Sequence, residues 1–224
     1  MSTLRTYLFA CAICATAAAP VHAGAAPDVL VEAAEVCTSN GTSKDVVLAQ
    51  LGSLGWEPIL GDTLASWQLP LFASPFLANA AYKTDHSPTW EQAWKEGILK
   101  SKRTFIRSKK ATRMSSFAFL EMSEQHAVLQ LGTRSLTNRE QLFCTIAIAD
   151  DPVVARDTVR DPNKDRLRPI NALTWFLSMD HKVLGTGIGM TGIDLNQKAI
   201  SQHISGDVPA DAYISAYVNV VVEI

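Results

Sequence analysis

The sequence predicts an α+β fold in which N-terminal helices pack on a mainly antiparallel sheet that includes a long C-terminal strand. The stretch Ser115–Asp150 divides into three short apolar segments separated by polar turns, which is typical of an antiparallel meander. Tyr213–Ile224 alternates apolar and polar residues, as a half-buried strand does. Upstream, between residues 42 and 105, apolar residues instead recur at helical spacing.

The first residues predict a secretory signal that is cleaved on export. One basic residue, Arg5, precedes an apolar run from Tyr7 to Ala19, and Val21-His22-Ala23 matches the small-x-small pattern of signal peptidase sites. The run is too short and too rich in alanine for a membrane span, and no later apolar run is long enough for one. We therefore expect residues 1–23 to be removed, and residues 24–224 to form a single α+β domain that is periplasmic or secreted and lacks a transmembrane span.

Composition excludes two broad classes of protein. Hydrophobic residues make up 47% of the chain, and the formal net charge at pH 7 is −2. A disordered chain has a smaller share of hydrophobic residues, and a strongly charged protein has a larger net charge. We expect a globular chain that buries a sizeable core.

The four cysteines reduce to two in the exported protein, because Cys11 and Cys14 lie in the signal segment. Cys37 and Cys144 remain, and an oxidising compartment favours a disulfide between them. Cys144 belongs to the apolar side of Leu142–Ile148, so the bond would connect the N-terminal region to the sheet. The alternative is a pair of separate buried thiols.

Local signals divide the N-terminal region into helices. Pro27–Cys37 predicts a brief helix or an extended lead-in. Thr42 and Asp45 resemble a capping box at the start of a helix that Gly55 ends. A further helical stretch is expected from Asp62 to Trp67, with interruptions at two prolines before Leu71–Ala81 resumes as a buried helix.

A longer amphipathic helix is predicted from Ser87-Pro88, since a capping side chain followed by proline is a favourable helix start. At about 100° per residue, Trp90, Trp94, Ile98 and Phe105 lie within roughly one quadrant and predict a stripe that faces the core.

The same helix carries the most informative charge feature of the chain. The window Lys95–Arg113 contains eight basic residues and a single acid, Glu96. With the aromatic stripe buried, the opposite side would present a candidate anion-binding set to solvent: Lys100, Arg103, Arg107 and Lys110. The expected partner is an anionic envelope component or an acidic protein, and nucleic acid is not expected. The alternative is a solvated face that pairs with acids elsewhere in the chain.

Three strands are expected in the meander: Ser115–Met122, His126–Leu131 and Gln141–Ala149, with Thr133–Glu140 as a polar loop. Further along, Asp151-Pro152 starts a possible short helix through Val159, and Arg160–Arg168 is a densely charged loop. Residues 171–204 give weak signals, which favour extended structure at Asn171–Met179 and Gly187–Leu195.

Short motifs do not predict a cofactor or a metal. Gly187–Gly192 matches G-x-G-x-x-G, but no helix and second parallel strand follow it, so we expect a glycine loop or bulged strand. Asp161, Asn163 and Asp165 begin like a calcium loop, but Arg166 and Ala172 stand where glycine and glutamate are required. The remaining histidines, His86, His126, His181 and His203, have no metal-ligand spacing.

These observations favour a non-catalytic envelope protein, a binding or structural module whose basic helix docks on an anionic surface or partner. The alternative is a periplasmic hydrolase whose site is assembled from distant residues, since the chain has no G-x-S-x-G nucleophile motif. A cleft with converging histidine and carboxylate groups would favour the hydrolase.

Overall fold

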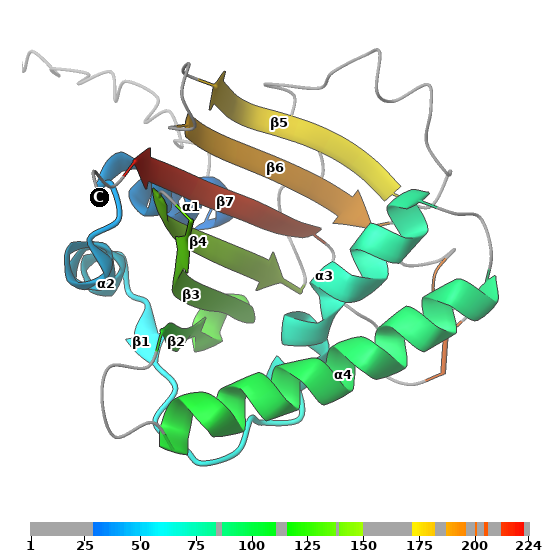
Figure 1. Ribbon diagram of the computed structural model, residues 1–224. Coiled ribbons are helices and arrows are strands. Elements are labelled where there is room, and N and C mark those ends of the chain that lie inside the picture. The colour runs from blue at the N-terminus through cyan, green and yellow to red at the C-terminus, as the bar shows by residue number, and fades with distance from the viewer. Residues whose placement is uncertain are drawn as a thin grey trace, which may run out of the picture.

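The computed structural model describes residues 29–83, 87–110, 116–137, 139–149, 172–181, 187–195, 200, 204–205 and 212–221. The expected signal segment 1–23, the expected helix 151–159 and the charged loop 160–168 lie outside these residues. Within them the chain has the predicted α+β fold, with N-terminal helices and an antiparallel sheet that the C-terminal strand joins (Figure 1).

In the described residues the sheet has seven strands in the order β1-β2-β3-β4-β7-β6-β5, and every neighbouring pair is antiparallel. The strands β2, β3 and β4 form the predicted meander, and β7 lies between β4 and β6. The strand bounds are β1 Glu57–Pro58, β2 Phe117–Met122, β3 Ala127–Leu136, β4 Arg139–Ile148, β5 Ala172–His181, β6 Gly187–Leu195 and β7 Ala212–Val221.

The expected polar loop Thr133–Glu140 is wrong, because most of it belongs to strands. β3 continues to Leu136 and β4 begins at Arg139, so a short turn joins them. The glycines of Gly187–Gly192 lie within β6, paired on both sides, and not at the strand-to-helix turn that a dinucleotide site needs.

One face of the sheet packs against α1 (Val29–Ser39) and α2 (Lys44–Ser53). The core there combines Leu30, Ala34 and Leu51 from the helices with Ile146 and Ile214 from the sheet, all fully buried. The helix α1 decides between the two interpretations of Pro27–Cys37, a brief helix or an extended lead-in, in favour of the helix.

The expected capping box at Thr42 is wrong, since Ser43 is the N-cap residue of α2 and its side chain makes no capping hydrogen bond.

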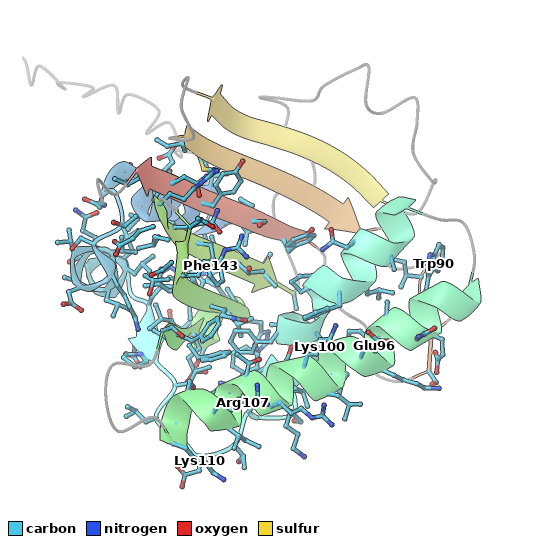
Figure 2. The ribbon with its side chains drawn as sticks, in the orientation of Figure 1. Trp90, Glu96, Lys100, Arg107, Lys110 and Phe143 are labelled. Atoms are coloured by element: carbon cyan, nitrogen blue, oxygen red, sulfur yellow. A yellow bond between two sulfur atoms is a disulfide. The ribbon has the colours of Figure 1, made fainter. Side chains whose placement is uncertain are left out.

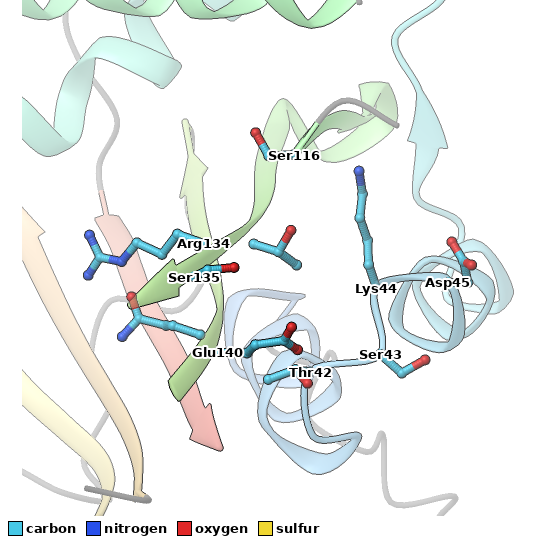
Figure 3. Close-up of a pocket in the computed structure, with 10 residues that line it drawn as sticks. Thr42, Ser43, Lys44, Asp45, Ser116, Arg134, Ser135 and Glu140 are labelled. Atoms are coloured by element: carbon cyan, nitrogen blue, oxygen red, sulfur yellow. The ribbon is translucent and has the colours of Figure 1, made fainter. Parts of the chain in front are cut away.

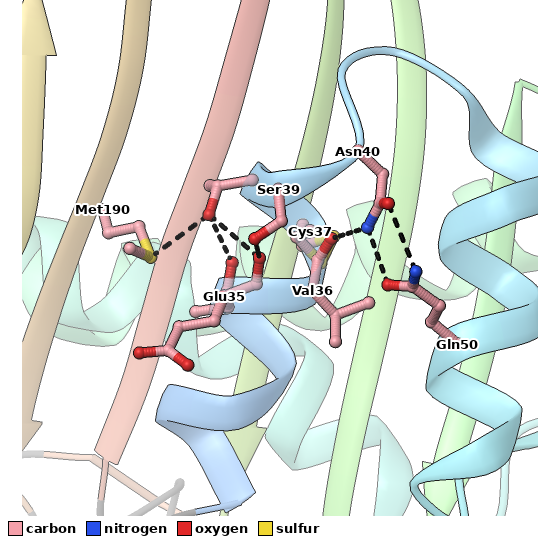
Figure 4. The surroundings of a disulfide bond; sticks show 10 residues. Glu35, Val36, Cys37, Ser39, Asn40, Gln50 and Met190 are labelled. Atoms are coloured by element: carbon pink, nitrogen blue, oxygen red, sulfur yellow. Dashed lines mark hydrogen bonds between the residues drawn. A yellow bond between two sulfur atoms is a disulfide. The ribbon is translucent and has the colours of Figure 1, made fainter.

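The predicted disulfide is present between Cys37 and Cys144, whose Cα atoms lie 6.2 Å apart (Figure 4). It joins the last turn of α1 to the central strand β4, and both cysteines are fully buried. Next to it, the hydroxyl of Thr38 donates to the carbonyl of Ala34 at 3.0 Å and contacts the sulfur of Met190 on β6 at 3.8 Å. The end of α1 is thus connected to two strands.

The opposite face is partly covered by α3 (Gln68–Lys83) and α4 (Ser87–Lys110). The ring of Phe119 on β2 meets Phe72 of α3 and Phe105 of α4 edge to face, with centroids 5.1 and 5.2 Å apart. The two helices also contact each other closely, since the hydroxyl of Ser101 donates to the carbonyl of Phe72 at 2.9 Å.

The expected helix at Asp62–Trp67 and the expected proline interruptions are both wrong. Residues 62–67 are not helical, and α3 runs from Gln68 through Pro70 and Pro75 without a break. Pro70 lies in the first turn, where its missing N–H has no intrahelical partner to lose. Pro75 costs one interior hydrogen bond, and the burial of neighbouring apolar side chains such as Leu71 and Leu77 offsets this cost.

A row of paired residues crosses the less covered face, formed by Phe117, Gly132, Phe143, Tyr217 and Gly189 on five successive strands. The outer ends of two rings occupy the space that glycine leaves. A Cβ at Gly132 would lie 2.4 Å from Cζ of Phe143, and one at Gly189 would lie 2.5 Å from Cζ of Tyr217. Both rings therefore lie low across the neighbouring strand, and any side chain at either glycine would displace them.

Loss of the disulfide is predicted to lower the free energy of unfolding by about 4 kcal/mol, because the bond closes a long loop in the unfolded chain. The two cysteines are 107 residues apart in the sequence. The double substitution Cys37→Ala with Cys144→Ala, compared with the oxidised wild type by urea denaturation, measures the effect. Equal stability of the two proteins would contradict the prediction.

Gly132→Ala is predicted to destabilise the fold by about 1–3 kcal/mol, since the new methyl group collides with Phe143. In a Phe143→Leu background the same substitution should cost less, so the two effects should not add. Gly52→Ala is the matched control, because a Cβ at Gly52 in α2 meets nothing within 4 Å. It should stabilise by about 0.5–1 kcal/mol. Additive effects of Gly132→Ala and Phe143→Leu in denaturant titrations would count against this packing.

Candidate functional site

The long helix α4 buries one side and exposes the other, as the sequence pattern predicts. Trp90, Trp94 and Phe105 of the predicted stripe are at most 5% exposed, and Ile98 is half-buried. The four candidate anion-binding residues on the other side are all exposed: Lys100, Arg103, Arg107 and Lys110. We refer to these four as the basic face of α4. Figure 2 shows the labelled cations Lys100, Arg107 and Lys110 spread along the helix.

Some of the helix cations have partners of their own. Lys95 pairs with Glu91 at 2.9 Å, and Lys100 pairs with Glu96 at 3.5 Å and lies 5.3 Å from the ring of Phe76. Lys109 donates to the carbonyl of Ile59 and lies 5.2 Å from the ring of Phe105. The contacts with Phe76 and Ile59 connect α4 to neighbouring segments, and the two ion pairs offset part of its positive charge.

Glu91 connects α4 to Ser205. Its carboxylate accepts hydrogen bonds from the backbone N–H of Ser205 at 3.2 Å and from its hydroxyl at 3.0 Å. The hydrogen bond with Lys95 and those from Ser205 lower the pKa of Glu91. The group therefore stays ionised over the usual working pH range, and its charge is already satisfied.

Three cations of the basic face, Arg103, Arg107 and Lys110, form no ion pair with any residue that the structure describes. Among the acids elsewhere in the chain that could pair with these cations, Asp150, Asp151 and Asp157 lie outside those residues. Exposed pairs such as Lys100–Glu96 contribute little energy in water, so Lys100 also remains available to an outside anion.

Two apolar residues share this face, which the charge analysis did not anticipate. Leu99 is 52% exposed, and Ile106 is half-buried. Leu99, Arg103, Ile106 and Lys110 follow one another at spacings of four, three and four residues, so they form one ridge along the helix. A helical wheel drawn for the solvent side of α4 would have found this ridge.

A separate hollow lies between the start of α2 and the paired ends of β3 and β4 (Figure 3). Its volume is about 760 Å³, and it is open to solvent. In Figure 3 the side chain of Lys44 extends towards Ser116, while that of Arg134 points away from Lys44. The described lining residues are polar: Thr42, Ser43, Lys44, Asp45, Ser116, Thr133, Arg134, Ser135, Glu140 and Gln141.

Lys44 is the titratable residue of this hollow whose pKa is shifted from its ordinary value. Partial burial lowers the pKa of Lys44, and the neighbouring Asp45 carboxylate opposes the shift. Sequence reasoning missed the hollow because its residues come from separate elements and because Thr133–Glu140 was assigned to a loop. The hollow offers hydroxyl groups and charges, but no histidine is among its described lining residues.

The hydrolase alternative depends on histidines that the structure describes only in part. His126 has a positive φ of 46° after a short 3₁₀ turn, and its ring lies 5.6 Å from that of Trp67. The side chains of His86, His181 and His203 lie outside the described part of the chain. Within that part, no group of three or more His, Cys, Asp and Glu residues is arranged to hold a metal ion. The hydrolase therefore stays a prediction.

None of the described helices combines the length and the apolar character needed to cross a membrane. Comparison of the chain with protein-family models, with curated proteins and with solved structures gave no match.

Lys44 is predicted to lose its proton at a lower pH in the folded protein than in the denatured protein, since burial disfavours the ammonium form. Asp45→Asn should lower this pKa further, because it removes the carboxylate that favours the charged form. NMR titration of ¹³C-methylated lysines in native and denatured protein measures both shifts. A native pKa at or above the denatured value would contradict the prediction.

Proposed function

We propose that the chain is an exported, non-catalytic binding module that docks on an anionic surface of the cell envelope through the basic face of α4. The observation that carries the proposal is the group of three exposed cations, Arg103, Arg107 and Lys110, on one rigid helix without an ion-pair partner among the described residues. The compartment is periplasmic or secreted. The disulfide supports this location, because such bonds persist in oxidising compartments.

A surface of anionic lipid headgroups suits this helix better than an acidic protein does. Leu99 and Ile106 lie among the cations, and a basic helix face with a few apolar side chains is typical of helices that lie at a membrane surface. The aromatic side of α4 is already buried against α3 and the sheet, so it cannot enter the bilayer. Docking is therefore peripheral, weak and mainly electrostatic.

The energy of docking follows from the number of cations. Each lysine or arginine close to an anionic bilayer contributes about 1 kcal/mol, and the four residues of the basic face thus supply a few kcal/mol at low salt. This attraction falls as salt rises, because the Debye length shrinks from about 10 Å at 0.1 M to about 3 Å at 1 M.

The test is sedimentation of the protein with vesicles of phosphatidylcholine, with and without phosphatidylglycerol. Wild type should bind only the anionic vesicles and should be released by salt. Arg103→Glu with Arg107→Glu should weaken binding about tenfold or more, since two attractions become repulsions. Leu99→Ser should weaken binding less and leave the salt dependence unchanged.

The matched control is Arg134→Glu with Arg139→Glu, which changes the net charge by the same amount on the sheet and not on α4. This variant should bind the vesicles nearly as well as wild type does. Equal losses in both double variants would show an effect of net charge alone and contradict docking through α4. Absence of wild-type binding to anionic vesicles at low salt would also overturn the proposal.

A further inference from the structure

A second surface lies on the sheet, on the part of the face that α3 and α4 leave uncovered. It is a shallow hollow of about 470 Å³ across β3, β4 and β7, within the size range of small-ligand sites. We call it the arginine–aromatic hollow, and its described lining residues are Arg134, Arg139, Gln141, Phe143, Ser215, Tyr217 and Asn219. None of them belongs to α4, so this surface is independent of the proposed docking face.

The floor of the hollow is formed by two aromatic rings. Phe143 extends over Gly132 on β3, and Tyr217 extends over Gly189 on β6, so the two rings lean in opposite directions across the sheet. Both side chains are half-buried. A ring that lies low on the backbone keeps part of its surface exposed and offers it to the apolar side of a flat or ring-shaped ligand.

Paired amides lie beside the rings. Gln141 and Asn219 face each other in the next row of the sheet, and Nε2 of Gln141 donates to Oδ1 of Asn219 at 2.7 Å. This bond orients both side chains and leaves the carbonyl oxygen of Gln141 and the amide hydrogens of Asn219 for other partners. An acceptor beside a donor at fixed positions matches neighbouring hydroxyl groups of a ligand.

The charge of the hollow is positive. Arg134 is exposed, with its guanidinium carbon 5.8 Å from the centre of the Phe143 ring, and Arg139 is half-buried at the start of β4. Neither arginine forms an ion pair with a described residue, and the described lining contains no carboxylate. The occupant that complements this charge carries an anionic group that a guanidinium can bind through two hydrogen bonds.

We propose that the arginine–aromatic hollow binds an acidic saccharide, a sugar ring or short oligosaccharide that carries carboxylate groups. The rings of Phe143 and Tyr217 contact the C–H face of the sugar, the amides of Gln141 and Asn219 bond its hydroxyl groups, and Arg134 with Arg139 binds the carboxylate. A lipid tail would leave the amides and arginines without partners. A bare anion would leave the rings uncovered.

The test is isothermal titration calorimetry with trigalacturonic acid as the probe. The controls are its methyl ester, which has the same rings without the charge, and sodium sulfate, which has charge without a ring. Wild type should bind the acid at least about tenfold more tightly than the ester, since the arginines contribute charge-assisted hydrogen bonds. Equal affinity for acid and ester, tighter binding of sulfate than of the acid, or no binding of the acid would overturn the proposal.

Two variants separate the contributions. Arg134→Gln should weaken binding of the acid about tenfold and leave binding of the ester unchanged. Tyr217→Leu should weaken both, because it removes a ring that both sugars contact. Circular dichroism checks that each variant is folded. If Tyr217→Leu does not fold, Arg134→Gln is sufficient to test the proposal, because Arg134 is exposed and its substitution should not disturb the fold.

The charge-matched control for Arg134→Gln is Arg103→Gln on α4, which should bind trigalacturonic acid as wild type does. Loss of saccharide binding in this variant, or unchanged binding in Arg134→Gln, would place the site elsewhere and overturn the proposal. Vesicle binding and saccharide binding are measured separately, so one can fail while the other holds.

Discussion

The structure depends on the insertion of β7 between β4 and β6. This strand pairs along almost its whole length on both sides, from Ala212 to Val221 against β4 and up to Asn219 against β6. Without it the β5–β6 hairpin would have no described strand neighbour to join it to the meander. Because β7 follows the other described strands in the sequence and lies between two of them, the described sheet can form only after distant segments have come together.

The two faces of the sheet differ in how the described helices cover them. The face under α1 and α2 is a continuous apolar core, and the bond from Cys37 to Cys144 fixes α1 to it. The other face is covered by α3 and α4 along only part of its strands, and its remainder carries polar and aromatic side chains. Among the described elements, the reach of these two helices separates the basic face of α4 from the arginine–aromatic hollow.

Both proposed surfaces combine positive charge with exposed apolar groups in a chain whose net charge is slightly negative. On α4, Leu99 lies among the cations of one ridge, and on the sheet Arg134 lies above the ring of Phe143. Charge alone attracts many anions, whereas charge beside a shaped apolar group selects among them. The helix ridge is convex and suits an extended surface, while the hollow suits a single small ligand.

The sequence by itself determined the α+β class, the meander, the terminal strand, the buried aromatic stripe of α4 and the disulfide. Each of these follows from a local period or from chemistry that a few residues carry, such as a pair of cysteines that can form a disulfide. The tertiary structure alone decided that α3 continues through Pro75, that most of Thr133–Glu140 belongs to strands, and that β7 lies between β4 and β6. It also placed Arg134, Phe143 and Tyr217 together, because strand pairing brings residues from distant parts of the chain into neighbouring rows of one face, and no local pattern records that register.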